Sequence, residues 1–395
     1  MDTATPLPAT DIIRRAYAVA RRDLRACYNP DGIVAGRLHF NAYWARDGFW
    51  ALFGALALGD YTQALAQLTT FMRFQLATGR LPVRVEFVGH HLGGYDTLRT
   101  RPKVVGRAGG IFNDPIDPTA FFIIAAREYV RRSGDAAFAR GFAPVMHRAI
   151  RWLRRHDRDG DGLIESYYLA DWMDSILKGN KLFNINVTYH EGLRAGADLA
   201  LVNGDEVTAE RLTAAAAHVH DRLQIFWTGQ YFADWIRGAR RGGFSADGNV
   251  LATLFQVASQ MQVQQILAYI RARGLDAVTP LVTCDPVYPL WRVFPLYYLA
   301  GIPDYHRTMI WPWLGTLNAV CKYRLGDQPA AYGDLARIGE WYLRSNAVNE
   351  VYDRVGQPIA RRFYHAEVPF AWGAGVYVYA VHELGLAGGE SRLGA

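Results

Sequence analysis

The sequence of 395 residues predicts an all-α protein built as an (α/α)6 barrel, with twelve helices in six hairpins. Two observations carry this prediction. Twelve segments place apolar residues at helical spacing, and these segments follow one another in pairs. The strand-like runs between them are short and do not alternate regularly with helices, which argues against a TIM barrel or a doubly wound sheet. A helical-repeat solenoid is the rival all-α fold, but the chain shows no repeat of fixed length.

The predicted elements follow from capping residues and apolar periodicity. Thr10 or Asp11 can cap a first helix whose apolar stripe includes Ile12, Ile13 and Val19. The other eleven helices are expected near residues 45–58, 60–77, 117–133, 135–156, 187–203, 206–227, 247–257, 259–273, 310–325, 328–345 and 369–385, with short strand-like runs at 81–88, 280–289 and 350–360. No linker interrupts this order, so residues 1–395 are predicted to form one catalytic domain, with a flexible glycine-rich tail from about residue 386.

Composition and charge narrow the class of protein. The chain is 51% hydrophobic and 20% charged, as globular proteins are, and Trp, Tyr and Phe supply 13% of its residues. Its net charge is +6, but the arginine runs lie at helical spacing like solvated helix faces, so no nucleic-acid partner is expected. No apolar window is long enough for a membrane span and no signal peptide is recognisable, which favours a cytoplasmic protein without a membrane partner. The three cysteines share no metal-ligand spacing, no dinucleotide or phosphate-binding motif is present, and no cofactor is expected.

Carboxylates and aromatic rings occur together at the junctions between loops and helices. These junctions are Trp44 to Trp50, Asn113 to Asp117, Asp171 to Asp174, Tyr305 to Trp313 and Asn349 to Asp353. In a helical barrel, alternate junctions converge on one end of the barrel. Rings stack on the C–H faces of sugars while carboxylates bind hydroxyl groups, so the pattern favours a small carbohydrate as the ligand.

Hydrolysis of a glycosidic bond needs two carboxyl groups, one protonated to serve as the acid and one ionised to activate water or attack carbon. Asp174 fits the acid because the apolar Trp172 and Met173 beside it can raise its pKa by desolvation. Glu350 fits the base. Taken singly, Asp174 could instead cap a helix, and Glu350 could pair with an arginine.

Four segments, in order along the chain, carry a family resemblance. Trp44-Ala-Arg46-Asp47 is similar to an N-terminal Arg-Asp motif, and Asp171-Trp-Met-Asp174-Ser resembles the WMDA segment of glycogen-debranching glucosidases and neutral invertases. Residues 305–312 look like the YHxGxxWP stretch of these enzymes, and residues 350–356 resemble the segment that carries their catalytic base. The chain therefore resembles the inverting (α/α)6-barrel glycosidases grouped with glucosidase family 63.

The resemblance implies a role for each matching residue. Asp174 would be the general acid and Glu350 the general base of a single displacement with inversion, with their carboxyl groups about 6.5–9.5 Å apart. Arg46 and Asp47 would contact the sugar where the bond breaks, Trp311 and Trp313 would form the walls, and His306 would lie near the rim. The full set predicted to bind substrate is Trp44, Arg46, Asp47, Asp114, Asp171, Trp172, Asn184, Asn186, Tyr305, His306, Arg307, Trp311, Trp313 and Trp372.

Three departures from the family pattern bear on the substrate. Asn184 stands where debranching enzymes and invertases carry a glutamate, Arg307 and Thr308 replace Asn-Gly, and the chain has only the bare barrel. An arginine at a rim can bind a carboxylate bidentately, or it can be a surface or ion-paired residue. These departures favour a small α-linked glucoside or mannoside, including one with an acidic aglycone such as glycerate.

Other interpretations of the sequence remain open. Asp157, Asp159 and Asp161 resemble the start of a calcium-binding loop, but Tyr168 stands where the last ligand belongs, so an Asp/Gly turn without a metal is the favoured interpretation. A sugar epimerase of the same barrel class would use His190, His306 or His365. A non-catalytic glycan-binding barrel is the third class.

Overall fold

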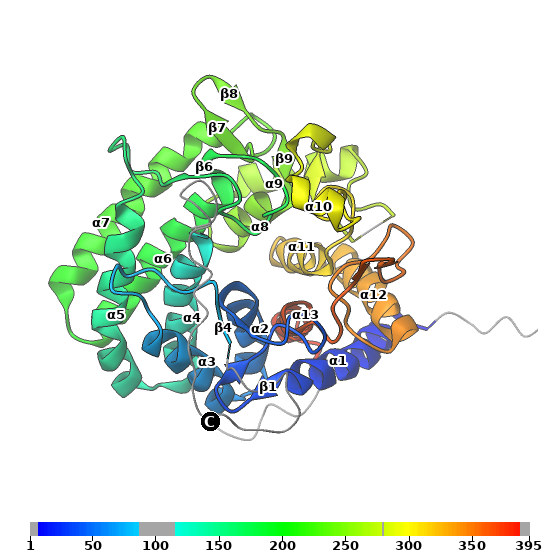
Figure 1. Cartoon of the computed structure of the whole chain (residues 1–395), viewed down its shortest axis with the longest axis horizontal. Coiled ribbons are helices and arrows are strands. Elements are labelled where there is room, and N and C mark those ends of the chain that lie inside the picture. Colours follow the sequence, from blue (N-terminus) through cyan, green and yellow to red (C-terminus); the bar gives the residue numbers. More distant parts are fainter. Residues whose placement is uncertain (1–6, 87–114, 279, 388–395) are drawn as a thin grey trace, which may run out of the picture.

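The computed structural model describes residues 7–86, 115–278 and 280–387, so most of the tail predicted to be flexible lies outside the described residues. Twelve long helices form two concentric rings, and the predicted (α/α)6 barrel is confirmed (Figure 1). The outer ring consists of α1 (Ala9–Ala26), α3 (Tyr61–Arg73), α5 (Ala136–Arg154), α7 (Glu206–Leu223), α9 (Gln260–Ala272) and α12 (Gln328–Ser345). The inner ring consists of α2 (Ala45–Ala57), α4 (Asp117–Ser133), α6 (Phe183–Val202), α8 (Ala246–Leu254), α11 (Pro312–Arg324) and α13 (Ala371–Glu383).

The inner ring closes on itself because each of its helices packs against the next. Helix α2 contacts α4, and the contacts continue through α6, α8, α11 and α13 back to α2. Inner helices are apolar on most of their surface, whereas outer helices such as α1 carry one apolar stripe that faces inward. The contact of α2 with α13 depends on glycine, since a Cβ added at Gly54 would lie 2.4 Å from the carbonyl oxygen of Gly375.

The strands are short and lie in the loops. Two-stranded antiparallel pairs join β1 (Tyr28–Asn29) to β2 (Gly32–Ile33), β3 (Tyr43–Trp44) to β4 (Arg84–Val85), β9 (Phe244–Ser245) to β10 (Cys284–Asp285) and β11 (Ala360–Arg361) to β12 (Tyr364–His365). A four-stranded antiparallel sheet has the order β5 (Glu165–Ser166), β6 (Asn180–Leu182), β7 (Trp235–Arg237) and β8 (Arg240–Arg241). Strands β3, β6 and β9 each lead directly into an inner helix.

The two rings begin their helices differently. Side chains of Asp135, Asp205, Ser259 and Asp327 cap four outer helices, whereas none of the six inner helices has a side-chain cap among the described residues. Loop carbonyls instead accept from the first N–H of four inner helices, for example Val83 from Ala45 and Asp234 from Phe183. This arrangement leaves the side chains at the start of each inner helix free for other partners.

Helix boundaries differ from the sequence prediction by a few residues in most cases. Helix α6 begins at Phe183 rather than 187, because Leu182 is extended and Phe183 is already inside the apolar core. The segment after β10 adds a short helix, α10 (Pro295–Leu299), and a 3-10 turn at Leu290–Arg292, neither of which was predicted. Within the described residues, no helix combines the length and apolar character that crossing a membrane would require.

Candidate active site

Polar and aromatic side chains at the start of the inner helices meet at one end of the barrel. The second residue of five inner helices is Arg46, Asn184, Asp247, Trp313 or Trp372, and α4 begins with Asp117. Direct contacts connect them: Arg46 binds Asp117, Asn184 binds Asp171, and Trp172 binds Asp247. We call this end of the barrel, where the inner helices begin, the N-terminal face of the inner ring. Parallel helix dipoles place positive potential there, which favours carboxylates.

Asp174 lies in this face on the loop that precedes β6. Its side chain is 46% exposed, and its Oδ1 atom accepts a hydrogen bond of 2.6 Å from the hydroxyl of Tyr297 in α10. Desolvation by the neighbouring protein raises the pKa of this carboxyl, while Arg46 and the Tyr297 hydroxyl lower it in part. The result is an accessible carboxyl that holds its proton to higher pH than an ordinary aspartic acid.

Glu350 is the second carboxyl of the face and is almost fully buried, with 2% of the residue exposed. Its two oxygens accept hydrogen bonds from the hydroxyls of Tyr305 and Tyr364 and from the backbone N–H of Glu367. Burial raises its pKa to about 7, and these three donors lower it in part. A carboxyl with this pKa ionises near neutrality, which suits a general base.

Glu367 connects the segment that carries Glu350 to the loop at residues 38–40. Its carboxylate accepts hydrogen bonds from the backbone N–H groups of Leu38, His39 and Phe40, the last two at 2.8 and 3.1 Å. Its own backbone also pairs with that of Glu350. Glu367 thereby fixes the 38–40 loop beside the base, a role that sequence analysis did not predict.

Arg46 and Asp47 lie at the start of α2. Arg46 binds Asp117 through two hydrogen bonds of 2.6 and 2.9 Å, the fork geometry of an arginine–carboxylate pair. Desolvation raises the pKa of Asp47 to about 6, against the attraction of Arg46. The carboxyl of Asp47 interacts with its own backbone N–H but forms no hydrogen bond or ion pair with another described residue, so it is available to a ligand.

A buried ionic network extends behind Asp171. The ammonium of Lys178, which is 1% exposed, lies 2.8 Å from Asp171 Oδ2 and 3.0 Å from Asp234 Oδ1. Tyr288 donates a further hydrogen bond to Asp234. The two carboxylates raise the pKa of Lys178 despite its burial, so the lysine stays charged.

Five tryptophans form a cluster around the axis of the barrel. Trp172 packs edge-on against Trp311 and Trp313, with ring centroids 5.4 and 5.0 Å apart, and Trp372 packs against Trp313 at 4.8 Å and Trp50 at 6.0 Å. All five are nearly buried. His306 stacks on Trp311 at 5.1 Å, and burial keeps the pKa of this histidine well below its ordinary value, so it is neutral.

Several buried polar atoms of the face have no partner within the described part of the chain. They are the indole Nε1 atoms of Trp44, Trp313 and Trp372 and the Oδ1 atom of Asp171. Unpaired donors and acceptors are costly when buried. Sugar hydroxyls both donate and accept, so they have the hydrogen-bonding chemistry that such atoms need.

Most residues predicted to bind substrate lie in or against this face, with specific exceptions. Asn186 is one exception: its Oδ1 accepts from Ile164 N–H and its Nδ2 donates to the carbonyls of Ile164 and Leu182, so the loop backbone binds its amide. Asp114 lies outside the described residues. Arg307 donates from Nε to the carbonyl of Tyr288, and no described carboxylate lies within ion-pair distance of its guanidinium.

The histidines proposed for an epimerase do not meet. His190 lies between α6 and α7 with its ring 5.8 Å from His220, and His365 is exposed with its carbonyl bound to His39. Of these three histidines, His306 alone lies at the N-terminal face of the inner ring. Neither His190 nor His365 therefore lies beside His306, as a second histidine for proton transfer would.

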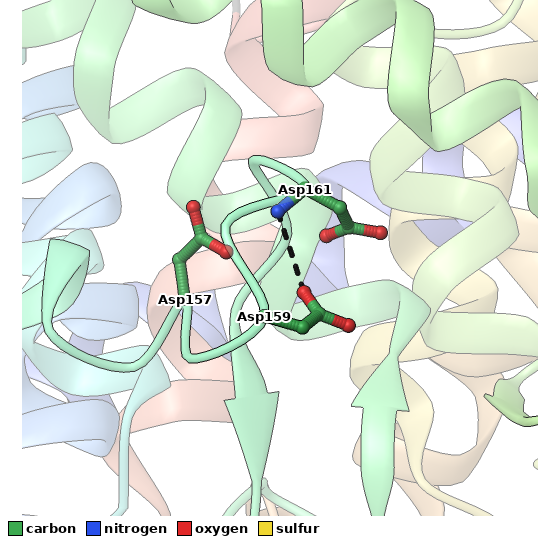
Figure 2. A group of neighbouring side chains, drawn as sticks. All are labelled: Asp157, Asp159 and Asp161. Carbon is green, nitrogen blue, oxygen red and sulfur yellow. Dashed lines mark hydrogen bonds between the residues drawn. The ribbon is translucent and has the colours of Figure 1, made fainter.

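The Asp157–Asp161 loop has carboxyl oxygens within 4.8 Å of one another (Figure 2). Each carboxylate also accepts from a backbone N–H of the turn, as in the bond of 3.3 Å from Asp161 N to Asp159 Oδ1. The Lys181 ammonium lies 2.7 Å from Asp159 and 2.6 Å from Asp161, and Arg222 lies 2.9 Å from Asp161. Lys181 and Arg222 thus already pair with the carboxylates that a metal would need, which favours a turn without a metal over a calcium site.

Sequence analysis missed Tyr297, Lys178, Asp234 and Asp247. The only signal for Asp247 was its place in a Ser-Ala-Asp-Gly run at the start of α8, the same position that Arg46 takes in α2. Tyr297 lies in a segment without periodicity, and a lone lysine or aspartate carries no motif. These residues become visible only when the loops are folded against one another.

Comparison with known proteins gives a structural result only. No protein-family model matches the sequence, and no curated protein matches it. The GH63 mannosylglycerate hydrolase from Thermus thermophilus in complex with Tris superposes with a TM-score of 0.72 and 15% identity, over 92% of this chain and 99% of that chain. Its complex with Tris and D-glycerate gives a TM-score of 0.70, 16% identity and the same coverage. A rhamnosidase from Klebsiella oxytoca with rhamnose bound gives 0.70 and 15%, over 97% of this chain and 65% of that chain. The fold is therefore that of (α/α)6-barrel glycoside hydrolases.

Proposed function

We propose that the protein is a glycoside hydrolase that cleaves a small α-linked glucoside or mannoside with inversion of configuration. The observation that carries the proposal is the pair of raised-pKa carboxyls, Asp174 and Glu350, each held by a tyrosine hydroxyl at one end of the barrel. Asp174, the accessible member, gives its proton to the leaving oxygen. Glu350, the buried member, takes a proton from the attacking water.

The remaining residues of the face support binding of a sugar. Asp47 and the free Oδ1 of Asp171 accept hydrogen bonds from sugar hydroxyls, and the unpaired indole N–H groups of Trp313 and Trp372 donate to them. The tryptophan cluster excludes water from around these contacts, which strengthens them. Arg46 holds positive charge beside Asp174 and Asp117 while the reaction proceeds.

An acidic aglycone, with glycerate as the simplest candidate, is part of the proposal. Among the described residues, the Arg307 guanidinium has a partner only at Nε, and its remaining N–H groups match a carboxylate. The mannosylglycerate hydrolase of the same fold, solved with D-glycerate, supports this choice by analogy. Under this proposal the enzyme prefers glucosylglycerate or mannosylglycerate to sucrose, trehalose, kojibiose and isomaltose.

The deciding experiment measures both turnover and stereochemistry. Proton NMR of the first-formed sugar should show the β-anomer, and the α-anomer would overturn the single-displacement mechanism. Asp174→Asn and Glu350→Gln should each lower kcat by a factor of about 10²–10⁴, while Asp205→Asn, which changes an exposed helix cap, should not. Asp174→Asn should recover most on an aryl glycoside with a good leaving group, because such a group needs less help from an acid. Sugar binding that survives Glu350→Gln, with no turnover of any glycoside by the wild type, would indicate a non-catalytic glycan-binding protein instead.

A further inference from the structure

A strongly basic hollow lies between two outer helices, apart from the candidate active site. It has a volume of about 620 Å³. Its polar lining comes from His147, Arg148, Arg151, Arg154 and Arg155 at the end of α5 and from Arg211 on α7. Pro144, Ile150 and Leu212 supply the rest of the lining, so no carboxylate and no Phe, Tyr or Trp ring of the described residues lines it.

The arginines of this hollow lack the partners that arginines have elsewhere in the chain. Among described residues, no carboxylate lies within 4.0 Å of the guanidinium groups of Arg151, Arg154, Arg155 or Arg211. By contrast, the arginine run at the end of α4 is neutralised, because Glu128 binds both Arg131 and Arg132. All but four of the 43 basic residues of the chain are arginine. This bias explains why arginines are numerous, but it does not explain why those of this hollow are grouped without carboxylate partners.

Helix electrostatics explains only part of the cluster. Arg154 and Arg155 lie at the C-terminus of α5, where positive charge is favourable. Arg148, Arg151 and Arg155 lie three or four residues apart on one face, however, and like charges at that spacing repel. Arg211 faces them from α7, and the helix-cap residue Asp205 attracts Arg211 and His147 without forming an ion pair within 4.0 Å with either. The fold thus keeps a repulsive cluster open to solvent, and an anion would relieve the repulsion.

We propose that this hollow binds a small molecule that carries at least two phosphate groups. Arginine forks match phosphate oxygens bidentately, and five of them around one hollow exceed what a single phosphate can use. The volume falls in the range of small-molecule sites, roughly 300–1,000 Å³. The lack of Phe, Tyr and Trp rings in the described lining argues against single-stranded nucleic acid, whose bases stack on such rings in the proteins that bind it.

The test uses inorganic pyrophosphate and triphosphate as probes in isothermal titration calorimetry at near-physiological salt. Wild-type protein should bind both, with triphosphate tighter. The double variant Arg151→Gln/Arg154→Gln and the single variant Arg211→Gln should each bind at least about tenfold more weakly. The matched control, Arg14→Gln/Arg15→Gln, removes two exposed arginines from outer helix α1 and should change the affinity less than about twofold.

Several results would overturn the proposal. These are no binding of either probe to the wild type, equal weakening in both double variants, or binding only to single-stranded DNA or to vesicles rich in anionic lipid without competition by triphosphate. Thermal unfolding checks that each variant is folded, and the Tm of each should stay close to that of the wild type because the substituted side chains are exposed. Hydrolase activity of the variants should be unchanged, which separates this site from the candidate active site.

Discussion

Tyr297 stacks on Tyr305 with ring centroids 5.6 Å apart, and the two hydroxyls donate to different carboxyl groups, Tyr297 to Asp174 and Tyr305 to Glu350. The stacked pair therefore sets the relative position of the proposed acid and base. Both rings come from the segment between β10 and α11, so one loop fixes both of these carboxyls. This gives the unpredicted helix α10 a direct part in the site.

Tyr297→Phe should shift the pH dependence of catalysis. The hydroxyl of Tyr297 lowers the pKa of Asp174, so its removal should raise that pKa further. Because a general acid must be protonated, the limb of kcat/KM that reports Asp174 should move to higher pH, with a modest fall in the maximum. Tyr298→Phe is the matched control, since Tyr298 is exposed and donates only to the carbonyl of Leu290. A limb that stays in place, or that moves equally in both variants, would contradict the assignment of Asp174.

Glu350 should tie activity and stability to the same pH. Its folded-state pKa of about 7 lies above the ordinary value of 4.5. One limb of the pH dependence of kcat/KM should therefore lie near pH 7, where the protonation state of the base changes. The raised pKa also means that folding costs free energy above pH 7, because the folded state disfavours the charged form that the unfolded state adopts.

Glu350→Gln should consequently stabilise the fold while it lowers activity. The gain should be absent below about pH 4.5, grow between pH 4.5 and 7, and reach about 3 kcal/mol above pH 7, less any loss from weaker hydrogen bonds. Urea unfolding of both proteins at pH 4, 6 and 8 measures it. A difference between the two proteins that is constant with pH would show that Glu350 is not held at a raised pKa.

The fold was predictable because its signals are local. Inner helices such as α13 are apolar on all sides, outer helices such as α1 have one apolar stripe, and the two types alternate along the chain. Boundaries were less predictable where tertiary contact decides them. Helix α6 starts earlier than predicted, with Phe183 buried in the core, and the unpredicted helix α10 carries the tyrosine that donates to Asp174.

The candidate site was predictable only where a motif marked it. Asp174 and Glu350 lie in segments that resemble known motifs. In the structure each accepts a hydrogen bond from one of the two stacked tyrosines, Tyr297 and Tyr305. Lys178 had no motif, because its role depends on Asp234, which is distant in sequence. Asn186 had the right residue type and position, but its amide faces the 164–182 loop rather than the inside of the ring.

Lys178→Met should destabilise the protein strongly. The substitution leaves Asp171 and Asp234 buried without a counter-charge, and loss of one member of such a network costs about 3–5 kcal/mol. The pKa of Asp234, already about 6, should rise further, so the destabilisation should be smaller at pH 5 than at pH 8. Lys181→Met is the control, since Asp159, one of its partners, is largely exposed. Denaturant unfolding should show less than half the loss for Lys181→Met, and equal losses would contradict a special role for Lys178.

Calcium should not stabilise the wild-type protein. The Lys181 ammonium occupies the space between Asp159 and Asp161, so a cation must displace it. Millimolar calcium chloride or EDTA should therefore change the Tm by less than about 1 °C. Lys181→Gln, which removes that charge, should gain a calcium-dependent rise in Tm. A rise of several degrees in the wild type would show instead that the loop is a calcium site.

Arg307→Gln should separate recognition of the aglycone from catalysis. If the free guanidinium binds a carboxylate of the substrate, its loss should raise KM for glucosylglycerate or mannosylglycerate about 10- to 100-fold, with little change in kcat. A substrate with an uncharged aglycone, such as the matching glycosyl glycerol, should be hydrolysed as before. Arg362→Gln, an exposed arginine on the β11–β12 turn, serves as the control and should affect neither substrate. An equal rise in KM for the charged and uncharged substrates would assign Arg307 to the structure of its loop, where it holds the carbonyl of Tyr288.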